Sequence, residues 1–199
     1  MNLPGTGIKI NYIDMKVEKT GFEGLLIIEP QVFGDARGYF YESYNPEKFK
    51  AAGIDIVFVQ DNLSKSAKGT IRGLHYQAGE KAQDKLCYVI SGAVLDVAVD
   101  IRYGSPTFGK YFACELTGEN KKQLLIPKGF AHGFSVLADE TIFAYKVSAP
   151  YSPIDERTIL FSDEGLAIDW KVEKPIVSEK DLKGIPFKDI AKEFIYSVK

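Results

Sequence analysis

The stretch Gly69-Thr-Ile-Arg-Gly-Leu-His-Tyr-Gln-Ala-Gly-Glu-Lys-Ala-Gln-Asp-Lys85 is the best guide to how this chain folds. Its first part, Thr70–Gln77, alternates well enough to predict a β-strand, and Gly73 leaves room for an approaching ligand. One of the two histidines in the chain, His75, lies on this strand. Strand residues an odd number of positions apart face opposite sides, so Arg72 and His75 can line one pocket only if a bulge or a twist re-aims one of them.

The second histidine has a similar setting, in the segment Ile126-Pro-Lys-Gly-Phe-Ala-His-Gly-Phe134. Both histidines are therefore flanked by aromatic residues and glycines in predicted strands. Histidine is the side chain whose ordinary pKa suits proton transfer near neutrality. The two settings together favour a catalytic or binding role. Taken alone, His132 fits a structural histidine equally well, and His75 fits a half-buried residue of an edge strand.

The rest of the chain follows a pattern of short strands separated by turn signals. Asn45 as N-cap, Pro46 at the first position and Gly53 at the end predict one short helix, and residues 187–194 form a second candidate helix. Further strands are predicted over residues 25–29, 39–44, 56–62, 86–90, 93–101, 110–116, 123–126, 131–137 and 141–147. Many short strands at even spacing indicate an all-β sandwich or barrel.

The length of 199 residues, with 45% hydrophobic residues, fits one domain with a substantial core, which we expect to occupy residues 15–199. Residues 1–14 have no clear period and precede Met15, a second candidate start. We therefore expect them to be an N-terminal extension, either an appended segment or the product of an alternative start.

Charge and cysteine content narrow the partners and the compartment. The formal net charge is −2 and the basic residues are spread out, so we expect no nucleic-acid or membrane partner. The sequence has no apolar run of membrane-spanning length, and its N-terminus lacks a signal-peptide core. The isolated Cys87 and Cys114 fit reduced core residues, which indicates a cytoplasmic protein.

Several kinds of chemistry have little support in the sequence. Two histidines without a His-x-His pair exclude an imidazole-rich metal site, while a mixed site with Asp or Glu stays open without a signal for it. Neither phosphate-binding glycine motif is present, and neither cysteine has a histidine beside it in sequence. We therefore expect metal-free acid–base chemistry, with a histidine base, a Lys or Arg that stabilises negative charge, and a tyrosine as candidate acid.

A series of ordered motifs extends this interpretation. They are Phe33-Gly-Asp-Ala-Arg-Gly-Tyr-Phe-Tyr-Glu42, Phe58-Val-Gln-Asp-Asn-Leu-Ser64, Arg72-Gly-Leu-His-Tyr-Gln77, Lys85-Leu86, Asp96-Val-Ala-Val-Asp-Ile-Arg102, Ser105-Pro-Thr-Phe-Gly109, Ile126-Pro-Lys-Gly-Phe-Ala-His-Gly-Phe134, Tyr145-Lys146, Tyr151-Ser-Pro153, Gly165-Leu-Ala-Ile-Asp-Trp170 and Ser178-Glu-Lys-Asp181. In content and order the chain resembles the dTDP-4-dehydrorhamnose 3,5-epimerase family of deoxysugar biosynthesis. The resemblance implies an all-β, cupin-like jelly-roll barrel with a few short peripheral helices. It also implies a homodimer, a dTDP-4-keto-6-deoxysugar substrate, and no metal or organic cofactor.

The resemblance also implies a reaction. In dTDP-4-dehydro-6-deoxy-D-glucose the C4 ketone acidifies the hydrogens on C3 and C5, and inversion of both carbons gives dTDP-4-dehydro-L-rhamnose. By resemblance His75 is the base, Asp181 orients it, Tyr145 is the acid and Lys85 stabilises the enolate oxygen. Without the resemblance, Tyr145 fits a core aromatic residue and Asp181 fits a helix or turn cap.

A second set of residues is implied to contact the nucleotide sugar. It comprises Arg37, Glu42, Gln60, Asp61, Asn62, Arg72, Lys85, His132, Glu156 and Lys180. The planar fork of an Arg suits a pyrophosphate, and an amide suits the donors and acceptors of the thymine edge. Taken alone, Glu42 and Glu156 fit solvated charges and Asn62 fits a turn residue. We interpret Asp96, Asp100 and Arg102 as a buried ion pair outside the site.

Three alternatives to a 3,5-epimerase stay open at this level. A mono-epimerase acting at C3 or C5 alone on a related dTDP-4-ketosugar would keep the same base and nucleotide motifs. A sugar 3,4-ketoisomerase fits less well, because we associate the complete histidine motifs with epimerases. A jelly roll that only binds a nucleotide sugar would need neither a base nor an acid.

Overall fold

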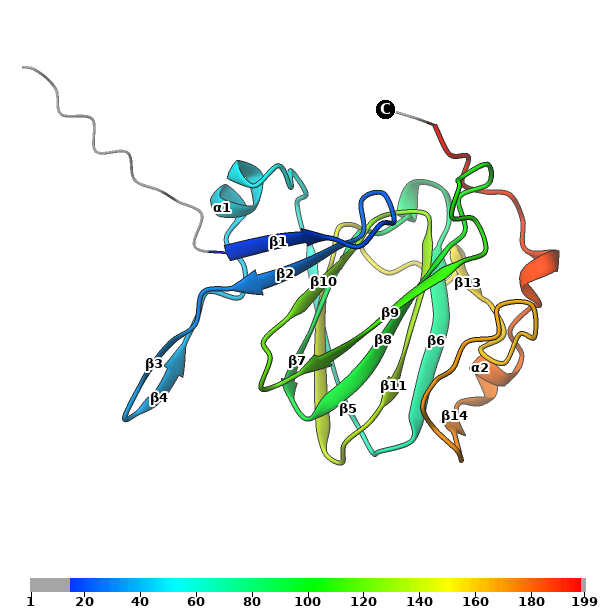
Figure 1. Cartoon of the computed structure of the whole chain (residues 1–199). Coiled ribbons are helices and arrows are strands. Elements are labelled where there is room, and N and C mark those ends of the chain that lie inside the picture. Colours follow the sequence, from blue (N-terminus) through cyan, green and yellow to red (C-terminus); the bar gives the residue numbers. More distant parts are fainter. Residues whose placement is uncertain (1–14, 198–199) are drawn as a thin grey trace, which may run out of the picture.

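The computed structural model describes residues 15–197 of the chain, and the predicted extension at residues 1–14 lies outside them. Two β-sheets of six strands each face one another and form the body of the molecule (Figure 1). This is the all-β jelly roll that the sequence predicts. Among the described residues, no helix is long and apolar enough to span a membrane.

The first sheet is antiparallel throughout and has the order β1-β2-β10-β7-β12-β5. Its strands are β1 (Met15–Lys19), β2 (Leu26–Pro30), β10 (Gln123–Ile126), β7 (Lys85–Ser91), β12 (Thr141–Val147) and β5 (Gln60–Ser66). Strands far apart in sequence are neighbours here, and β7 and β12 place side chains from two distant segments on one inner face.

The second sheet has the order β13-β6-β11-β8-β9, and the short strand β14 pairs in parallel with β6. Its strands are β13 (Glu156–Thr158), β6 (Thr70–Gln77), β11 (Phe130–Val136), β8 (Ala93–Asp100), β9 (Tyr111–Thr117) and β14 (Ile176–Val177). Both predicted histidine strands, β6 and β11, are therefore adjacent in the centre of one sheet.

The apolar run of β8 is explained by burial on both of its faces. Val94 and Ala98 point into the core between the sheets, where they share a cluster with Phe134 and Phe143. The alternate residues of β8 pack on the outer side, in a cluster with Trp170 and other residues of the C-terminal segment. A strand covered on both faces is apolar on both, which removes the usual alternation, and its two aspartates, Asp96 and Asp100, are buried with polar partners.

A bulge between β6 and β11 changes the direction of side chains in the stretch Gly69–Lys85. His132 lies opposite His75, but Phe134 lies opposite Arg72, so β6 carries one extra residue at this point. Gly73 has φ 125°, and a Cβ added to it would lie 2.5 Å from Cα of Gly133. Two glycines are thus needed where the backbones approach closely, and the bulge lets Arg72 and His75 line one pocket.

The helices are short and peripheral. Helix α1 (Pro46–Ala51) begins as predicted, with the Asn45 side chain accepting two backbone hydrogen bonds, and α2 (Glu179–Leu182) begins after the cap residue Ser178. Two 3₁₀ turns cover Gly79–Lys81 and Phe187–Asp189. The second candidate helix is therefore wrong beyond Asp189, where Ile190 returns to extended backbone.

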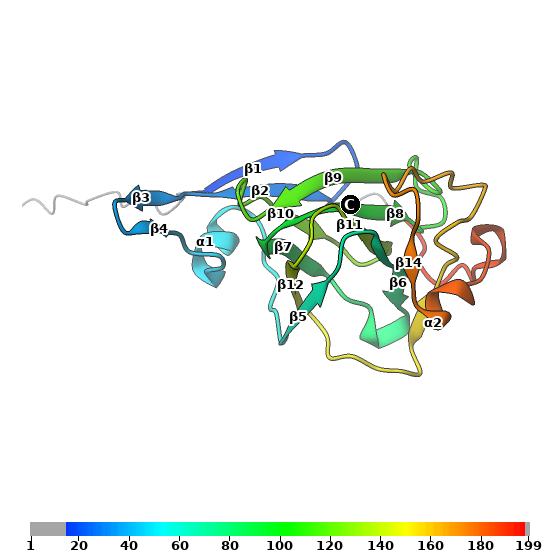
Figure 2. The ribbon, with the colours of Figure 1, turned by 90° about the horizontal axis from the view of Figure 1, so that it is seen from below.

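The strands β3 (Phe33–Asp35) and β4 (Gly38–Phe40) form a hairpin, here named the arm, which projects away from the body (Figures 1 and 2). The predicted strand over residues 39–44 is therefore shorter than expected. The strand predicted over residues 56–62 begins only at Gln60, because its partner β12 ends opposite that residue, at Val147.

Candidate active site

A pocket of about 680 Å³ lies between the sheets and is closed on one side by α2. Its walls come from β5, β6, β7, β11, β12, β13, β14 and α2. The volume is in the range of pockets that bury small ligands. Among the lining residues are Arg72, His75, Lys85, His132, Tyr145, Glu156, Lys180 and Asp181, all of which the sequence analysis singles out.

A histidine–carboxylate pair lies in the wall formed by β6 and α2. Nε2 of His75 is 2.5 Å from Oδ1 of Asp181, although 106 residues separate the two. The Asp181 side chain is 4% exposed and the His75 side chain 28%, so the carboxylate is hidden behind a ring that meets the pocket. The backbone N–H of Gly73 donates to the other Asp181 oxygen at 3.5 Å, which fixes the carboxylate against the β6 bulge.

The charge of Asp181 is stabilised in place. Burial raises the pKa of this carboxyl, but hydrogen bonds from His75 and the local cap, with the charge of His75, outweigh burial and lower the pKa below its ordinary value. Asp181 is therefore a carboxylate at neutral pH. An ionised carboxylate only accepts hydrogen bonds, so Nε2 of His75 donates and the Nδ1 lone pair is left for another proton.

Lys85 and Tyr145 occupy the opposite wall, on adjacent strands of the other sheet. Lys85 is buried, and its Nζ donates to the backbone oxygen of His75 at 3.3 Å. Burial lowers the pKa of the Lys85 amine and raises the pKa of the Tyr145 phenol. A phenol whose pKa is raised keeps its proton at neutral pH, so Tyr145 is available as a proton donor.

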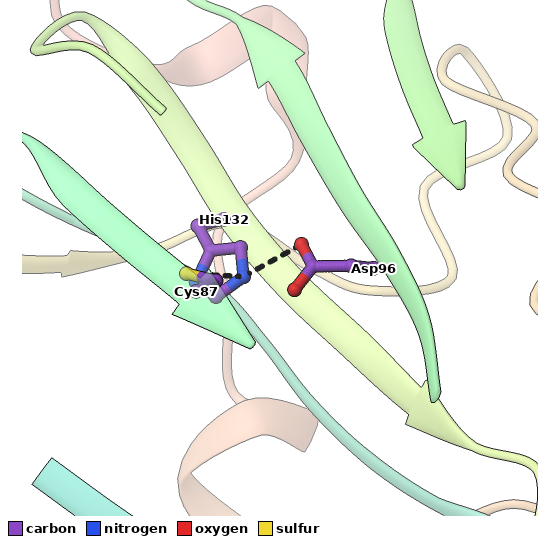
Figure 3. Close-up of side chains that lie close together, drawn as sticks. All are labelled: Cys87, Asp96 and His132. Carbon is purple, nitrogen blue, oxygen red and sulfur yellow. Dashed lines mark hydrogen bonds and ion pairs between the residues drawn. The ribbon is translucent and has the colours of Figure 1, made fainter. Parts of the chain in front are cut away.

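The second histidine lines the pocket and forms a buried cluster with Asp96 and Cys87, which are not themselves among the lining residues (Figure 3). Nε2 of His132 lies 2.9 Å from Oδ1 of Asp96 and 3.8 Å from Sγ of Cys87. Burial lowers the pKa of the His132 imidazole, against the opposing effect of Asp96, which favours the neutral ring. We give the name floor cluster to Cys87, Asp96 and His132.

The pairing of Asp96 differs from our interpretation of the sequence. Asp100 and Arg102 do form an ion pair, with 2.7 Å between Oδ2 and Nη2, but Asp96 contacts His132 instead. A signal was available, because Asp96 shares the inward-facing parity of Val94 and Ala98 on β8. A carboxylate in the middle of an apolar inner face needs a polar partner.

The rim of the pocket carries charged groups that bond to one another. Nζ of Lys180 lies 2.5 Å from Oε2 of Glu156, which also accepts a hydrogen bond of 2.8 Å from the Tyr151 hydroxyl. Nε of Arg72 donates to Oγ of Ser66 at 3.2 Å. These cations face the pocket beside the His75–Asp181 pair and are suitable for holding an anionic ligand.

Three of the predicted binding residues lie on β5, outside the lining of this pocket. The Gln60 amide donates to Asn62 at 2.8 Å, and its oxygen accepts from the backbone of the rim residue Tyr151 at 3.0 Å. Asp61 points the other way on the strand and pairs with Lys146 at 2.9 Å, with 72% of its side chain exposed. Gln60 and Asn62 therefore adjoin the rim, and Asp61 does not.

The other two predicted binding residues belong to the arm and its base. Arg37 lies at the turn of the arm, pairs with Asp35 at 2.6 Å and has 90% of its side chain exposed. Glu42 bonds to Asn45 and Lys48 and lines a smaller pocket of about 220 Å³ between the arm, β2 and α1. Within this chain the structure does not bring them to the pocket that contains His75.

Known proteins share this arrangement of sequence and fold. The sequence profile described as dTDP-4-dehydrorhamnose 3,5-epimerase matches residues 19–189. The chain belongs to the dTDP-4-dehydrorhamnose 3,5-epimerase family. A Shigella flexneri protein of that name is 54% identical over 176 residues, which cover 88% of this chain and 97% of the relative.

Solved structures agree with the family assignment. An epimerase of Legionella pneumophila, solved in complex with dTDP-4-keto-L-rhamnose, superposes with a TM-score of 0.89 at 47% identity, covering 92% of this chain and all of that one. A 3'-monoepimerase of Streptomyces bikiniensis, in complex with dTDP-quinovose, gives a TM-score of 0.82 at 31% identity, covering 86% and 87% of the two chains. The cupin-like fold that the sequence predicts is thereby confirmed.

Proposed function

We propose that this chain inverts C3 and C5 of dTDP-4-dehydro-6-deoxy-D-glucose and so forms dTDP-4-dehydro-L-rhamnose. The observation that carries the proposal is the His75–Asp181 pair in one wall of the pocket, with Tyr145 in the wall opposite. The family match supports the same reaction. The enzyme is thus an isomerase, specifically a carbohydrate epimerase.

The base in the proposed mechanism is His75. Asp181 accepts from Nε2, which leaves Nδ1 free to take a proton from the carbon next to the C4 ketone. The Asp181 carboxylate also stabilises the imidazolium that forms and holds the ring in one orientation, as the aspartate of a Ser-His-Asp triad does for its histidine. Because the pair lies on β6 and α2, the base approaches the sugar from the side of the second sheet.

The acid is Tyr145, which approaches from the first sheet. Facing sheets are about 10 Å apart, which leaves room for a sugar ring between side chains of the two walls. A ring held there presents one face to His75 and the other to Tyr145. Proton removal by His75 followed by delivery from Tyr145 therefore inverts the carbon. The same two groups serve the second carbon after His75 has released its proton to solvent and the Tyr145 phenolate has regained one.

Negative charge builds up on the C4 oxygen between the two proton transfers. Lys85 is a buried amine beside the base, since its Nζ donates to the His75 backbone oxygen. A cation fixed in a site that excludes water stabilises an enolate strongly, because no solvent has to reorganise. Arg72 and Lys180 at the rim are proposed to hold the pyrophosphate, and Gln60 and Asn62 the thymine.

Solvent-deuterium uptake into the dTDP-ketosugar tests the reaction. We expect uptake with inversion at both C3 and C5, whereas uptake at a single carbon would identify a mono-epimerase and no uptake a protein that only binds. His75→Asn should abolish exchange, with a loss of about 10²–10⁴-fold as expected for a general base. Wild-type exchange in that variant would show that the base is wrongly assigned.

We also propose that the enzyme is a homodimer in which the arm packs on a second copy. The arm projects from the body (Figure 2), and its residues Phe33, Tyr39 and Phe40 are each exposed by 57–66%. The outer side of residues 57–63 carries Val57, Val59 and Leu63, also exposed. Burying these two apolar surfaces together would favour association.

The dimer would explain why Arg37 and Glu42 lie away from the pocket of their own chain, because the arm would bring them to the pocket of its partner. Mixing inactive His75→Asn with Arg37→Ala subunits distinguishes the two arrangements. If Arg37 acts across the interface, mixed dimers recover one intact site and activity rises on mixing. No recovery, with dimers confirmed by light scattering, would place Arg37 in its own chain's site or in none.

The proposed location is the cytoplasm. Cys87 and Cys114 are both free, as expected in a reducing compartment. Activity found only outside the cytoplasmic fraction of the source cells would contradict this assignment.

A further inference from the structure

The floor cluster has the composition of a metal site. Cys87 on β7, Asp96 on β8 and His132 on β11 each offer one ligand atom, and these atoms lie within 4.8 Å of one another (Figure 3). Cys87 and Asp96 have no exposed surface and His132 is 5% exposed. A thiol, a carboxylate and an imidazole that converge in a buried space are the ligand types that zinc prefers.

The polar atoms of the floor cluster do not all find hydrogen-bond partners within the protein. Nε2 of His132 faces both Asp96 and Cys87, but a neutral ring nitrogen carries one hydrogen at most and cannot donate to both. Oδ2 of Asp96 is buried and has no hydrogen-bond partner among the described residues. Buried polar atoms without a partner are rare because each costs about 1–3 kcal/mol.

We propose that Cys87, Asp96 and His132 bind a zinc ion, and that zinc held there inhibits the epimerase. In a tetrahedral site, bonds of about 2.0–2.3 Å place neighbouring ligand atoms about 3.5 Å apart. The separations in the floor cluster are 2.9 Å and 3.8 Å, with 4.8 Å as the upper bound for the third. Small side-chain shifts therefore suffice to admit the ion.

Charge and protons balance when the ion binds. Cys87 gives up its S–H proton to solvent, and the neutral His132 ring moves its hydrogen from Nε2 to Nδ1 so that Nε2 can bond to the metal. One thiolate and one carboxylate then neutralise the 2+ charge, and one proton is released for each zinc bound. Oδ2 of Asp96 lies next to the ion and ceases to be unsatisfied.

The inhibitory part rests on the proposed function. His132 lines the same pocket as Lys85 and His75, so the cluster adjoins the pocket and the pocket is the route by which an ion reaches it. Cys87 also pairs with Tyr145 across β7 and β12. Zinc at this point adds positive charge beside the pocket, next to the strand partner of the proposed acid, and repels the Lys85 cation, which lies close enough to Cys87 and Asp96 to feel their charge.

Cobalt(II) in place of zinc gives a readout that does not depend on activity, because a thiolate bound to cobalt produces an intense near-ultraviolet charge-transfer band. We expect one cobalt per chain with this band in the wild-type protein, and zinc inhibition that EDTA reverses. Cys87→Ala should lose the band and weaken zinc inhibition by at least about 10-fold. Cys114→Ala is the matched control and should keep both, because Cys114 is outside the cluster.

Cys87→Val, which fills the buried volume with an apolar group, serves as a second variant in case Cys87→Ala fails to fold. No thiolate band in the wild type, or a band that persists without Cys87, would overturn the site. A Cys87-dependent band without inhibition would overturn the inhibitory part alone. If the wild type has no epimerase activity, the proposed function fails while the cobalt spectrum still decides the site.

Discussion

Replacing Tyr145 with Phe should separate proton removal from proton return. The change deletes one hydroxyl and keeps the ring, which packs 5.9 Å from the Phe143 ring, centroid to centroid. His75 can still take a proton, exchange it with solvent and return it to the same face. The variant should therefore incorporate deuterium with retained configuration, while inversion falls.

The expected magnitudes differ between reaction and stability. Loss of a general acid costs about 10²–10⁴-fold in rate, equivalent to about 3–5 kcal/mol in the barrier. No residue in the described part of the chain hydrogen-bonds to the Tyr145 hydroxyl, so the free energy of unfolding should change by less than about 1 kcal/mol. A stable, folded variant with a large loss of inversion is the predicted combination.

One NMR time course in deuterated buffer measures both quantities, with exchange followed by loss of the C3 and C5 proton signals and inversion by the appearance of product. Urea denaturation of the same sample gives the stability. If exchange and inversion fall in the same proportion, or neither falls, Tyr145 is not the acid and the assignment of the two walls is wrong.

Three further predictions concern the His75–Asp181 pair, the need for a metal in catalysis, and the bulge at Gly73. The folded pKa of Asp181 is depressed, so its contribution to stability is present above about pH 4 and is lost as the pH falls through the folded pKa. Asp181→Asn should therefore weaken the dependence of stability on pH in the acid range, measured by urea denaturation. The same variant should lower the epimerisation rate more than the affinity for substrate. Epimerase activity should survive prolonged EDTA treatment, and activity that vanished and returned with added metal would contradict this. Gly73→Ala should destabilise the protein by at least about 3 kcal/mol, because the added Cβ would lie 2.5 and 2.8 Å from backbone atoms. Gly104→Ala is the control, since Gly104 also has positive φ but open space around it, and it should cost only about 1 kcal/mol. Thermal denaturation measures both, and equal losses of stability would refute the clash.

The sequence predicts the strands of the body well, because their alternation reflects burial against a second sheet. Thr70–Gln77, Gln123–Ile126 and Thr141–Val147 are found with the predicted bounds. Strands β1, β3, β13 and β14 are missed: β3, β13 and β14 have only two or three residues, too few to show a period, and β1 forms by pairing with β2. Strand ends likewise depend on where a partner stops, as at Gln60.

The candidate site is predictable in its residue types and much less so in its contacts. His75 stands out in the sequence, but Asp181 carries no local signal that it will reach the ring across 106 residues. The floor cluster is missed for the same reason, since Cys87, Asp96 and His132 come from three strands. Only the sheet order brings such residues together, and that order is not written in any one segment.

The stacked rings of Phe134 and Phe143 lie 4.2 Å apart and join β11 of one sheet to β12 of the other. The proposed base, His75, lies on β6, the neighbour of β11 in the second sheet, and the proposed acid, Tyr145, lies on β12 of the first sheet. The packing of these two rings therefore helps to set the distance between the two sheets, and with it the distance between the proposed base and the proposed acid. The width of the proposed catalytic gap therefore depends on packing in the hydrophobic core, so that loosening this core should change the rate of proton transfer as well as the stability of the protein.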